Sequence, residues 1–159
     1  MEDHLRHELI GLLNNGWAYA DPAEILADFP EEQMNSFPPN VPYTPWHLLE
    51  HIRFCQQEIL EQIEAEVMPT YAFPDDFWPD RDAVATREMW DKSVRQFFHD
   101  RDRFMDIARR EDLTSLCRNN DKASILHALF NIAAHNHYHF GEFSILRQVM
   151  QTWPAGHNQ

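Results

Sequence analysis

Apolar residues recur every three or four positions in four long stretches of this chain, and the prolines fall between those stretches or at their edges. This spacing places the apolar side chains on one face of an α-helix. No run alternates between apolar and polar residues with the period of two that indicates a half-buried strand. The pattern predicts an all-α protein, a four-helix bundle built as a single domain over residues 1–159. The helices are expected over about residues 2–14, 45–66, 83–109 and 122–150.

Local signals mark where helices begin and where they cannot continue. Thr44 before Pro45 is typical of an N-cap and a first helical residue, and Asp21 before Pro22 predicts an additional short helix over residues 21–29. Residues 68–79, MPTYAFPDDFWP, contain three prolines and cannot stay helical. Because this segment is rich in aromatic residues, we expect it to cover the core or to wall a pocket at the open end of the bundle.

The composition limits the partners of the chain. A formal net charge of −13 repels phosphate backbones and anionic lipid surfaces, which argues against nucleic acid and membranes as partners. Cys55 and Cys117 are far apart in sequence and form no C-x-x-C pair, as is typical of a reducing compartment. The start of the chain has no signal-peptide pattern, and about 18 apolar residues never run together. We expect a cytoplasmic protein.

Three histidines fall within five positions of the last predicted helix. A residue turns an α-helix by about 100°, so His135 and His139 lie about 40° apart while His137 points nearly the opposite way. A metal ion bound to one ring nitrogen of each would satisfy two buried imidazoles, whereas hydrogen bonds at the bundle rim are the alternative. The pair shares its predicted core-facing stripe with Ala128, Asn131, Ile132, Tyr138, Glu142, Leu146 and Val149.

The second predicted helix offers a matching pair, because His47 and His51 are again four residues apart. Metal sites in helical bundles take their ligands from more than one helix, so the two pairs together favour a metal site. Four ligands would close a tetrahedral site, and three would leave a position open for water or substrate. The mid-helix Gly141 is unfavourable for helix formation, and its missing side chain predicts that a neighbouring helix approaches closely there.

Five segments, which together extend over nearly the whole chain, carry a resemblance to a known family: TPWHLLEHIRFCQ (residues 44–56), HNHYHFGE (135–142), FPDDFWP (73–79), MWDKS (89–93) and NNGWAYADPAEILADFP (14–30). They resemble the DinB-like (YfiT-related) superfamily, small four-helix bundles that carry three histidines on a divalent metal. The resemblance implies that His51, His135 and His139 are the metal ligands. His47 is not a usual ligand of the family, so it is expected at the site rim or as a hydrogen-bond partner of the site.

The chain departs from the family pattern at Glu142, where glutamine is usual. This carboxylate either orients a histidine, holds a water molecule or reaches solvent. Cys55 follows His51 by one turn and is either a group facing the metal or a small buried hydrophobe. For Glu58 and for Tyr138 two roles are open, either acid or base chemistry or a structural role. The sequence assigns no catalytic residue.

The resemblance also implies a class of chemistry. Relatives include enzymes that use low-molecular-weight thiols such as bacillithiol or mycothiol, and others described as metal-dependent hydrolases. The expected activity is therefore hydrolysis or thiol transfer with zinc or nickel as the divalent ion. The alternative is a non-catalytic bundle that binds a metal or a ligand. An exposed apolar helix face would allow the chain to form a homodimer.

Overall fold

The computed structural model describes residues 2–14 and 20–154, so residues 15–19 of the NNGWAYADPAEILADFP segment lie outside the described residues. The chain is mostly helical, which confirms the all-α prediction. A small antiparallel hairpin, β1 (Leu116–Cys117) with β2 (Asn120–Ser124), joins the last two helices. The helices are α1 (Glu2–Asn14), α2 (Pro22–Leu26), α3 (Pro45–Glu64), α4 (Arg87–Arg110) and α5 (Ile125–Val149).

Capping side chains explain where the helices begin. The Thr44 hydroxyl accepts a hydrogen bond from the backbone of His47, as predicted for the start of α3, and the Asp21 carboxylate accepts one from Ala23 at the start of α2. The same arrangement at Thr86 starts α4 four residues later than predicted. α2 is shorter than expected and ends at Leu26.

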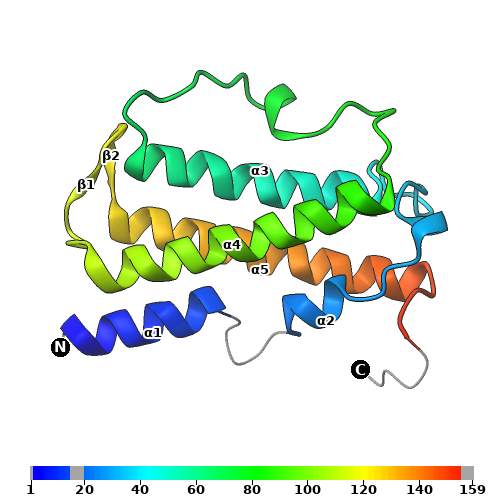
Figure 1. Cartoon of the computed structure of the whole chain (residues 1–159), viewed down its shortest axis with the longest axis horizontal. Coiled ribbons are helices and arrows are strands. Elements are labelled where there is room, and N and C mark those ends of the chain that lie inside the picture. Colours follow the sequence, from blue (N-terminus) through cyan, green and yellow to red (C-terminus); the bar gives the residue numbers. More distant parts are fainter. Residues whose placement is uncertain (1, 15–19, 155–159) are drawn as a thin grey trace.

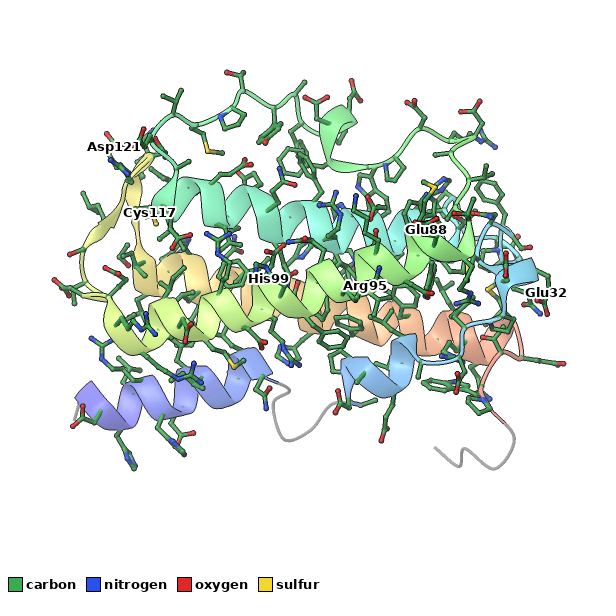
Figure 2. The ribbon with its side chains drawn as sticks, viewed as in Figure 1. Glu32, Glu88, Arg95, His99, Cys117 and Asp121 are labelled. Atoms are coloured by element: carbon green, nitrogen blue, oxygen red, sulfur yellow. The ribbon has the colours of Figure 1, made fainter. Side chains whose placement is uncertain are left out.

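The hairpin was not predicted, and it moves the start of α5 from residue 122 to Ile125. Strands of two and five residues are too short to show a period of two in the sequence. Asn120–Ser124 pairs with Leu116–Cys117, and the Ser124 hydroxyl then caps the helix. The hairpin lies at one end of the bundle, where Cys117 is buried, far along the bundle from α2 (Figures 1 and 2).

The bundle is built around α3, which packs against both α4 and α5 (Figure 1). α1 covers α4 and α5 over one half of their length, and α2 packs on α5 in the other half. The segment from residue 65 to 86 contains a single turn of 3₁₀ helix, Asp75–Phe77, and runs along the outside of α3. Within the described ranges, none of the helices is long and apolar enough to cross a membrane.

The hydrophobic core consists of two clusters, one in each half of the bundle. The first contains α1 and the hairpin, the second contains α2 and the residues around it, and α3, α4 and α5 contribute to both. Polar residues lie where the clusters meet along the helices: Gln56 on α3, Asp100 on α4 and His139 on α5 are all buried. The histidines thus lie on the boundary between the two halves.

A buried arginine fastens α2 and the chain after α5 to the second cluster. The guanidinium of Arg147 is fully buried and donates hydrogen bonds to the carbonyl oxygens of Ile25, Ala27 and Thr152. It also lies between the rings of Phe29 and Trp153, 5.1 and 4.7 Å from their centres. These contacts hold α2 in place although that helix has only five residues.

Candidate metal centre

Three imidazole rings from two helices meet beside the boundary of the two core clusters. His51 comes from α3, and His135 and His139 come from successive turns of α5. The Nε2 atom of His51 lies 3.2 Å from the Nε2 atoms of both other histidines. His51 and His139 are buried, and His135 is partly buried. The structure therefore brings together the three histidines that the family resemblance singled out.

Hydrogen bonds on the far side of two rings fix which nitrogen carries the proton. The Nδ1 atom of His51 lies 2.8 Å from the carbonyl oxygen of Phe77, and that of His139 lies 2.7 Å from a carboxylate oxygen of Glu142. Both partners accept, so both rings carry their proton on Nδ1 and keep a lone pair on Nε2. Two lone pairs that face each other at 3.2 Å repel, whereas a cation is attracted to both. The donor set thus fits a divalent ion.

Burial favours the neutral form of His135 and His51, the form that binds a metal. Desolvation, with the neighbouring His139 and His51, lowers the pKa of His135 to about 3. Desolvation also lowers the pKa of His51, although the hydrogen bond to Phe77 opposes this. Trp78 stacks on His51, with ring centres 3.9 Å apart and planes inclined by 6°. The aromatic segment before α4 therefore covers the histidine centre through Trp78.

Cys55 is the fourth candidate at this position. His51, Cys55 and His135 each offer one ligand atom such that these atoms lie within 4.8 Å of one another, so this group could hold a metal ion. The thiol sulfur is nearly equidistant from the two ring nitrogens of His51, at 3.8 and 3.9 Å, and lies beside that ring rather than beyond Nε2. Burial, aided by the Glu58 carboxylate, raises the pKa of Cys55 to about 12. The free thiol is consequently protonated and a poor nucleophile.

Glu142 has the first of the three roles considered for it, since it orients His139. Tyr43, in the loop before α3, lies beside the same carboxylate, and burial together with Glu142 raises the pKa of its hydroxyl to about 12. Tyr43 also packs on Trp78, with ring centres 5.3 Å apart. Sequence reasoning missed Tyr43, because nothing local connects a loop tyrosine to a glutamate about 100 residues later.

Two expectations about α5 are corrected. Tyr138 and Val149 are 67% and 50% exposed, and Asn131 is exposed too. The predicted core-facing stripe is therefore wrong at these three positions, which lie outside the buried face of the helix. The buried face is centred on bulky residues such as Phe140 and Phe143, which the bundle places against α2 and α4. The tyrosine ring still contacts His139, with centres 4.9 Å apart. Gly141 is exposed, and a Cβ there would meet no atom within 4 Å, so no helix of the same chain approaches it closely among the described residues.

His47 and Glu58 have structural partners. The Nδ1 atom of His47 accepts a hydrogen bond from the backbone of Thr44, which completes the cap of α3, and its Nε2 lies 3.2 Å from the carbonyl oxygen of Ala83. Glu58 accepts a hydrogen bond from Gln62, and burial raises the pKa of its carboxyl group. His47 still borders the cleft described next, as expected for a residue at the rim.

A cleft of about 780 Å³ opens on the outer side of Tyr43 and Trp78. Among the described residues that line the cleft, Arg81 is the one charged side chain. It makes no hydrogen bond or ion pair with any residue that the structure describes. The lining is otherwise mainly apolar: Phe37, Pro38, Val41, Pro42, Tyr43, Trp78 and Pro79, with Asn40 and His47. Trp78, which stacks on His51, and Tyr43, which packs on Trp78, thus form a wall of the cleft.

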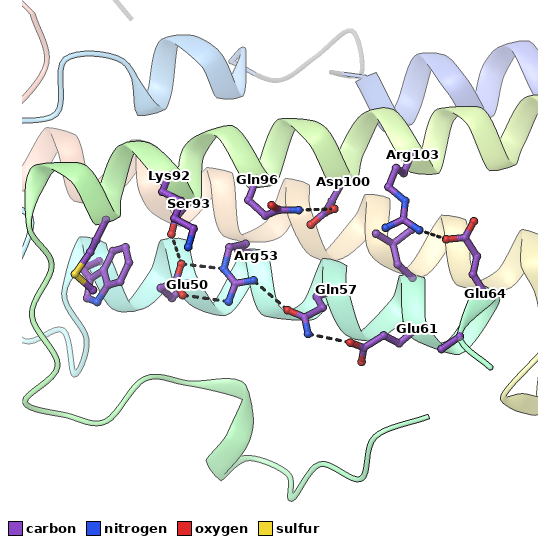
Figure 3. A pocket seen from close by; sticks show the side chains of 14 residues that line it. Glu50, Arg53, Gln57, Glu61, Glu64, Lys92, Ser93, Gln96, Asp100 and Arg103 are labelled. Atoms are coloured by element: carbon purple, nitrogen blue, oxygen red, sulfur yellow. Dashed lines mark hydrogen bonds and ion pairs between the residues drawn. The ribbon is translucent and has the colours of Figure 1, made fainter. Parts of the chain in front are cut away.

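A second groove, of about 750 Å³, lies between α3 and α4 (Figure 3). Its α3 residues Arg53 and Gln57 follow His51 and Cys55 by two positions, so they lie on nearly the opposite face of the helix. Glu50 binds Arg53 and Ser93, and the chain of hydrogen bonds continues through Gln57 to Glu61. Because these polar groups satisfy one another, the groove is not a second candidate for the metal.

The fold and the site together define the class of this protein. It is a helical bundle with a buried His-Cys-His group that could hold a metal ion. The family model described as DinB superfamily matches residues 16–143. The chain is therefore a member of the DinB superfamily, as its motifs suggested. No curated protein and no solved structure matches it at a significant level.

Proposed function

We propose that this chain is a metal-dependent enzyme in which His51, His135 and His139 hold a divalent ion, and which uses water or a low-molecular-weight thiol to attack a small molecule. The convergence of the three Nε2 atoms, with two of the rings fixed from behind by Phe77 and Glu142, carries the proposal. When bound, the ion supplies Lewis acidity that makes water or a thiol more nucleophilic near neutral pH. Zinc is the expected ion and nickel its main rival, because both suit imidazole ligands.

Two residues outside the ligand set position the site. Glu142 holds the proton of His139 on Nδ1, which keeps Nε2 free and makes it more basic. With a pKa of about 12, the hydroxyl of Tyr43 stays protonated at neutral pH and donates its proton to Glu142. Its oxygen can then accept a hydrogen bond from a bound substrate.

The cleft beside Tyr43 and Trp78 supports a substrate with an apolar, flat body and an anionic group. Aromatic and proline side chains offer surfaces for stacking, and Arg81 offers the single positive charge. In a chain of net charge −13, an arginine that has no partner among the described residues and lies at the edge of an apolar cleft is a specific attraction for an anion. This assignment fits a small carboxylate better than a cation.

The metal content of the purified protein tests the ligand set. Tag-free protein prepared without added metal is compared by elemental analysis with His51→Ala, His135→Ala and His139→Ala, and with His127→Ala as a matched control, because His127 is an exposed histidine of the same helix. We expect close to one equivalent of metal in the parent and the control, and none in the three ligand variants. Circular dichroism verifies that the helices persist.

Metal retained by any of the three variants would reject that residue as a ligand, and a parent that neither contains nor takes up metal would reject the proposal. With the site established, turnover of small esters, amides and electrophiles is measured with and without added thiol. A rate that rises with thiol concentration indicates transfer, and a rate independent of thiol indicates hydrolysis.

A further inference from the structure

Two tyrosine hydroxyls from different parts of the fold meet at the carboxylate that orients His139. Tyr43 precedes α3 and is partly buried, whereas Tyr138 lies on α5, one turn before Glu142, and is 67% exposed. Each hydroxyl forms a hydrogen bond with the side chain of Glu142. The ring of Tyr138 also meets the ring of His139 edge-on, with centres 4.9 Å apart.

The carboxylate of Glu142 is an acceptor for each of these groups. An ionised carboxylate has two oxygens with about four lone pairs and donates nothing. Its partners among the described residues are Nδ1 of His139, at 2.7 Å, and the two tyrosine hydroxyls. The charge of Glu142 and the hydrogen bond to it raise the pKa of Tyr138, so this hydroxyl stays protonated at neutral pH and donates as Tyr43 does.

We propose that Tyr138 is a positioning residue of the histidine centre, which together with Tyr43 holds the carboxylate of Glu142 by hydrogen bonds from two elements of the fold. The carboxylate in turn holds His139 in the orientation that binds a metal ion. The inference rests on the metal site proposed above, because Nε2 of His139 is one of its ligand atoms. It decides between the two roles that were open for Tyr138.

The contact between Glu142 and His139 is too weak to fix the imidazole by itself. The two residues are three positions apart on the same helix, and the glutamate side chain is 27% exposed. A pair of this kind competes with water, and a glutamate side chain loses rotamer freedom when the pair forms. Donors from α5 and from the loop before α3 restrict the carboxylate to one orientation, so less freedom remains to be lost when a metal binds.

The number of donors also explains why a carboxylate suits position 142. Three donors converge there, whereas an amide has a single acceptor oxygen with two lone pairs. A glutamine could therefore not accept all three hydrogen bonds. The tyrosine hydroxyls and the acidic side chain belong together as one arrangement behind His139.

NMR of chelator-treated protein tests this arrangement without a metal. A histidine Nδ1 proton held by a carboxylate gives a signal far downfield, visible only while the proton exchanges slowly with water. We expect such a signal from His139, assigned by its loss in Glu142→Ala, and its broadening or loss in Tyr138→Phe. Tyr71→Phe is the matched control, because the hydroxyl of Tyr71 donates to a different carboxylate, that of Glu61, at 2.6 Å.

The affinity for zinc shows through which residue Tyr138 acts. In competition with a chromophoric chelator, we expect Tyr138→Phe to weaken zinc binding by about three- to tenfold in the parent. In the background of Glu142→Ala the same substitution should change the affinity by at most about twofold. A residue that acts through Glu142 gives this non-additive result, whereas a general structural role gives equal losses in both backgrounds.

The two measurements separate this inference from the proposed function. Equal losses of zinc affinity in the two backgrounds, an unchanged His139 signal in Tyr138→Phe, or an equal effect of Tyr71→Phe would each overturn the role of Tyr138. A parent that binds no zinc would reject the proposed function, and the His139 signal of the metal-free protein would then decide whether Tyr138 holds this ring. Phenylalanine keeps the aromatic ring, and circular dichroism verifies that the variants fold.

Discussion

The carboxylate of Glu142 lies 2.7 Å from Nδ1 of His139, on the side of the ring that faces away from His51. A carboxylate behind a metal-ligand histidine fixes the ring and raises the basicity of the other nitrogen. A glutamine at this position would offer an amide oxygen as acceptor without the charge. Glu142 would therefore strengthen metal binding by the proposed ligand set more than a glutamine.

Replacing Glu142 should weaken metal binding, and the loss of affinity should depend on the replacement. Glu142→Ala removes the acceptor, and we expect the affinity for zinc to fall by about 10- to 100-fold. Glu142→Gln keeps an acceptor and should lose less. Competition with a chromophoric chelator measures both affinities. Glu58→Gln is the control, because Glu58 binds Gln62 and not a histidine; equal losses in all variants would contradict the role of Glu142.

Cys55 should not be a ligand, because its sulfur lies beside the ring of His51 rather than beyond Nε2. Cobalt substitution distinguishes the possibilities, since a bound thiolate gives a strong charge-transfer band in the near ultraviolet. We expect no such band in the parent, and unchanged metal content in Cys55→Ser. A band that disappears in Cys55→Ser would make the site a His-Cys-His site.

Arg81 should select anionic ligands for the cleft. Phenylacetate and its uncharged analogue phenylacetamide are titrated by NMR into metal-free protein, so that neither probe can bind a metal. Arg81→Gln should weaken phenylacetate by about fivefold, as expected for an exposed charge pair, and leave phenylacetamide unchanged. Arg95→Gln, at a different surface on α4, should change neither. Equal binding of the two probes to the parent would contradict the assignment.

The buried amide of Gln56 should reduce the stability of the protein. Neither its nitrogen nor its oxygen has a hydrogen-bond partner among the described residues, although the side chain is fully buried. An unsatisfied buried polar group costs about 1–3 kcal/mol. Gln56→Met keeps the shape, and we expect a melting temperature higher by about 2–4 °C by calorimetry. Gln57→Met is the control, because the amide of Gln57 forms hydrogen bonds with Arg53 and Glu61. This substitution should not raise the melting temperature of the protein.

Glu58 should make stability depend on pH. Burial raises the pKa of its carboxyl group in the folded protein, so the charged form is penalised there. The contribution of the protonated Glu58 carboxyl group to stability is complete below the pKa that this group has in the unfolded chain. It is lost as the pH rises through the pKa of the group in the folded protein. Glu58→Gln should thus melt about 1–2 °C above the parent at pH 7.5 and at the same temperature near pH 4, in the presence of a chelator. A difference that does not change with pH would contradict this account.

The helices and the pair His135 and His139 were accessible from the sequence because their signals are local. Thr44 and Pro45 are adjacent, and His135 and His139 are one turn apart, so spacing alone places each on its element. The three-histidine ligand set came from the family resemblance rather than from spacing, and it stays a prediction until metal is measured.

The partners of the triad were out of reach because they are set by tertiary structure. The carbonyl oxygen of Phe77 reaches His51 from a segment 26 residues away, and no side-chain pattern encodes a backbone acceptor. Tyr43 meets Glu142 only when the bundle has formed. The exposure of Tyr138 was misjudged for a related reason: several residues of α5 are apolar on both sides of the helix, and packing decides which side is buried.

The division of the core into two clusters means that the halves need not open together. α1 belongs to one cluster, while α2 belongs to the other, where Arg147 fastens it through three carbonyl oxygens. Backbone amides of α1 can therefore exchange with solvent through a local opening that leaves α2 and its surroundings protected. The first helix can separate from the bundle while the half fastened by Arg147 stays folded.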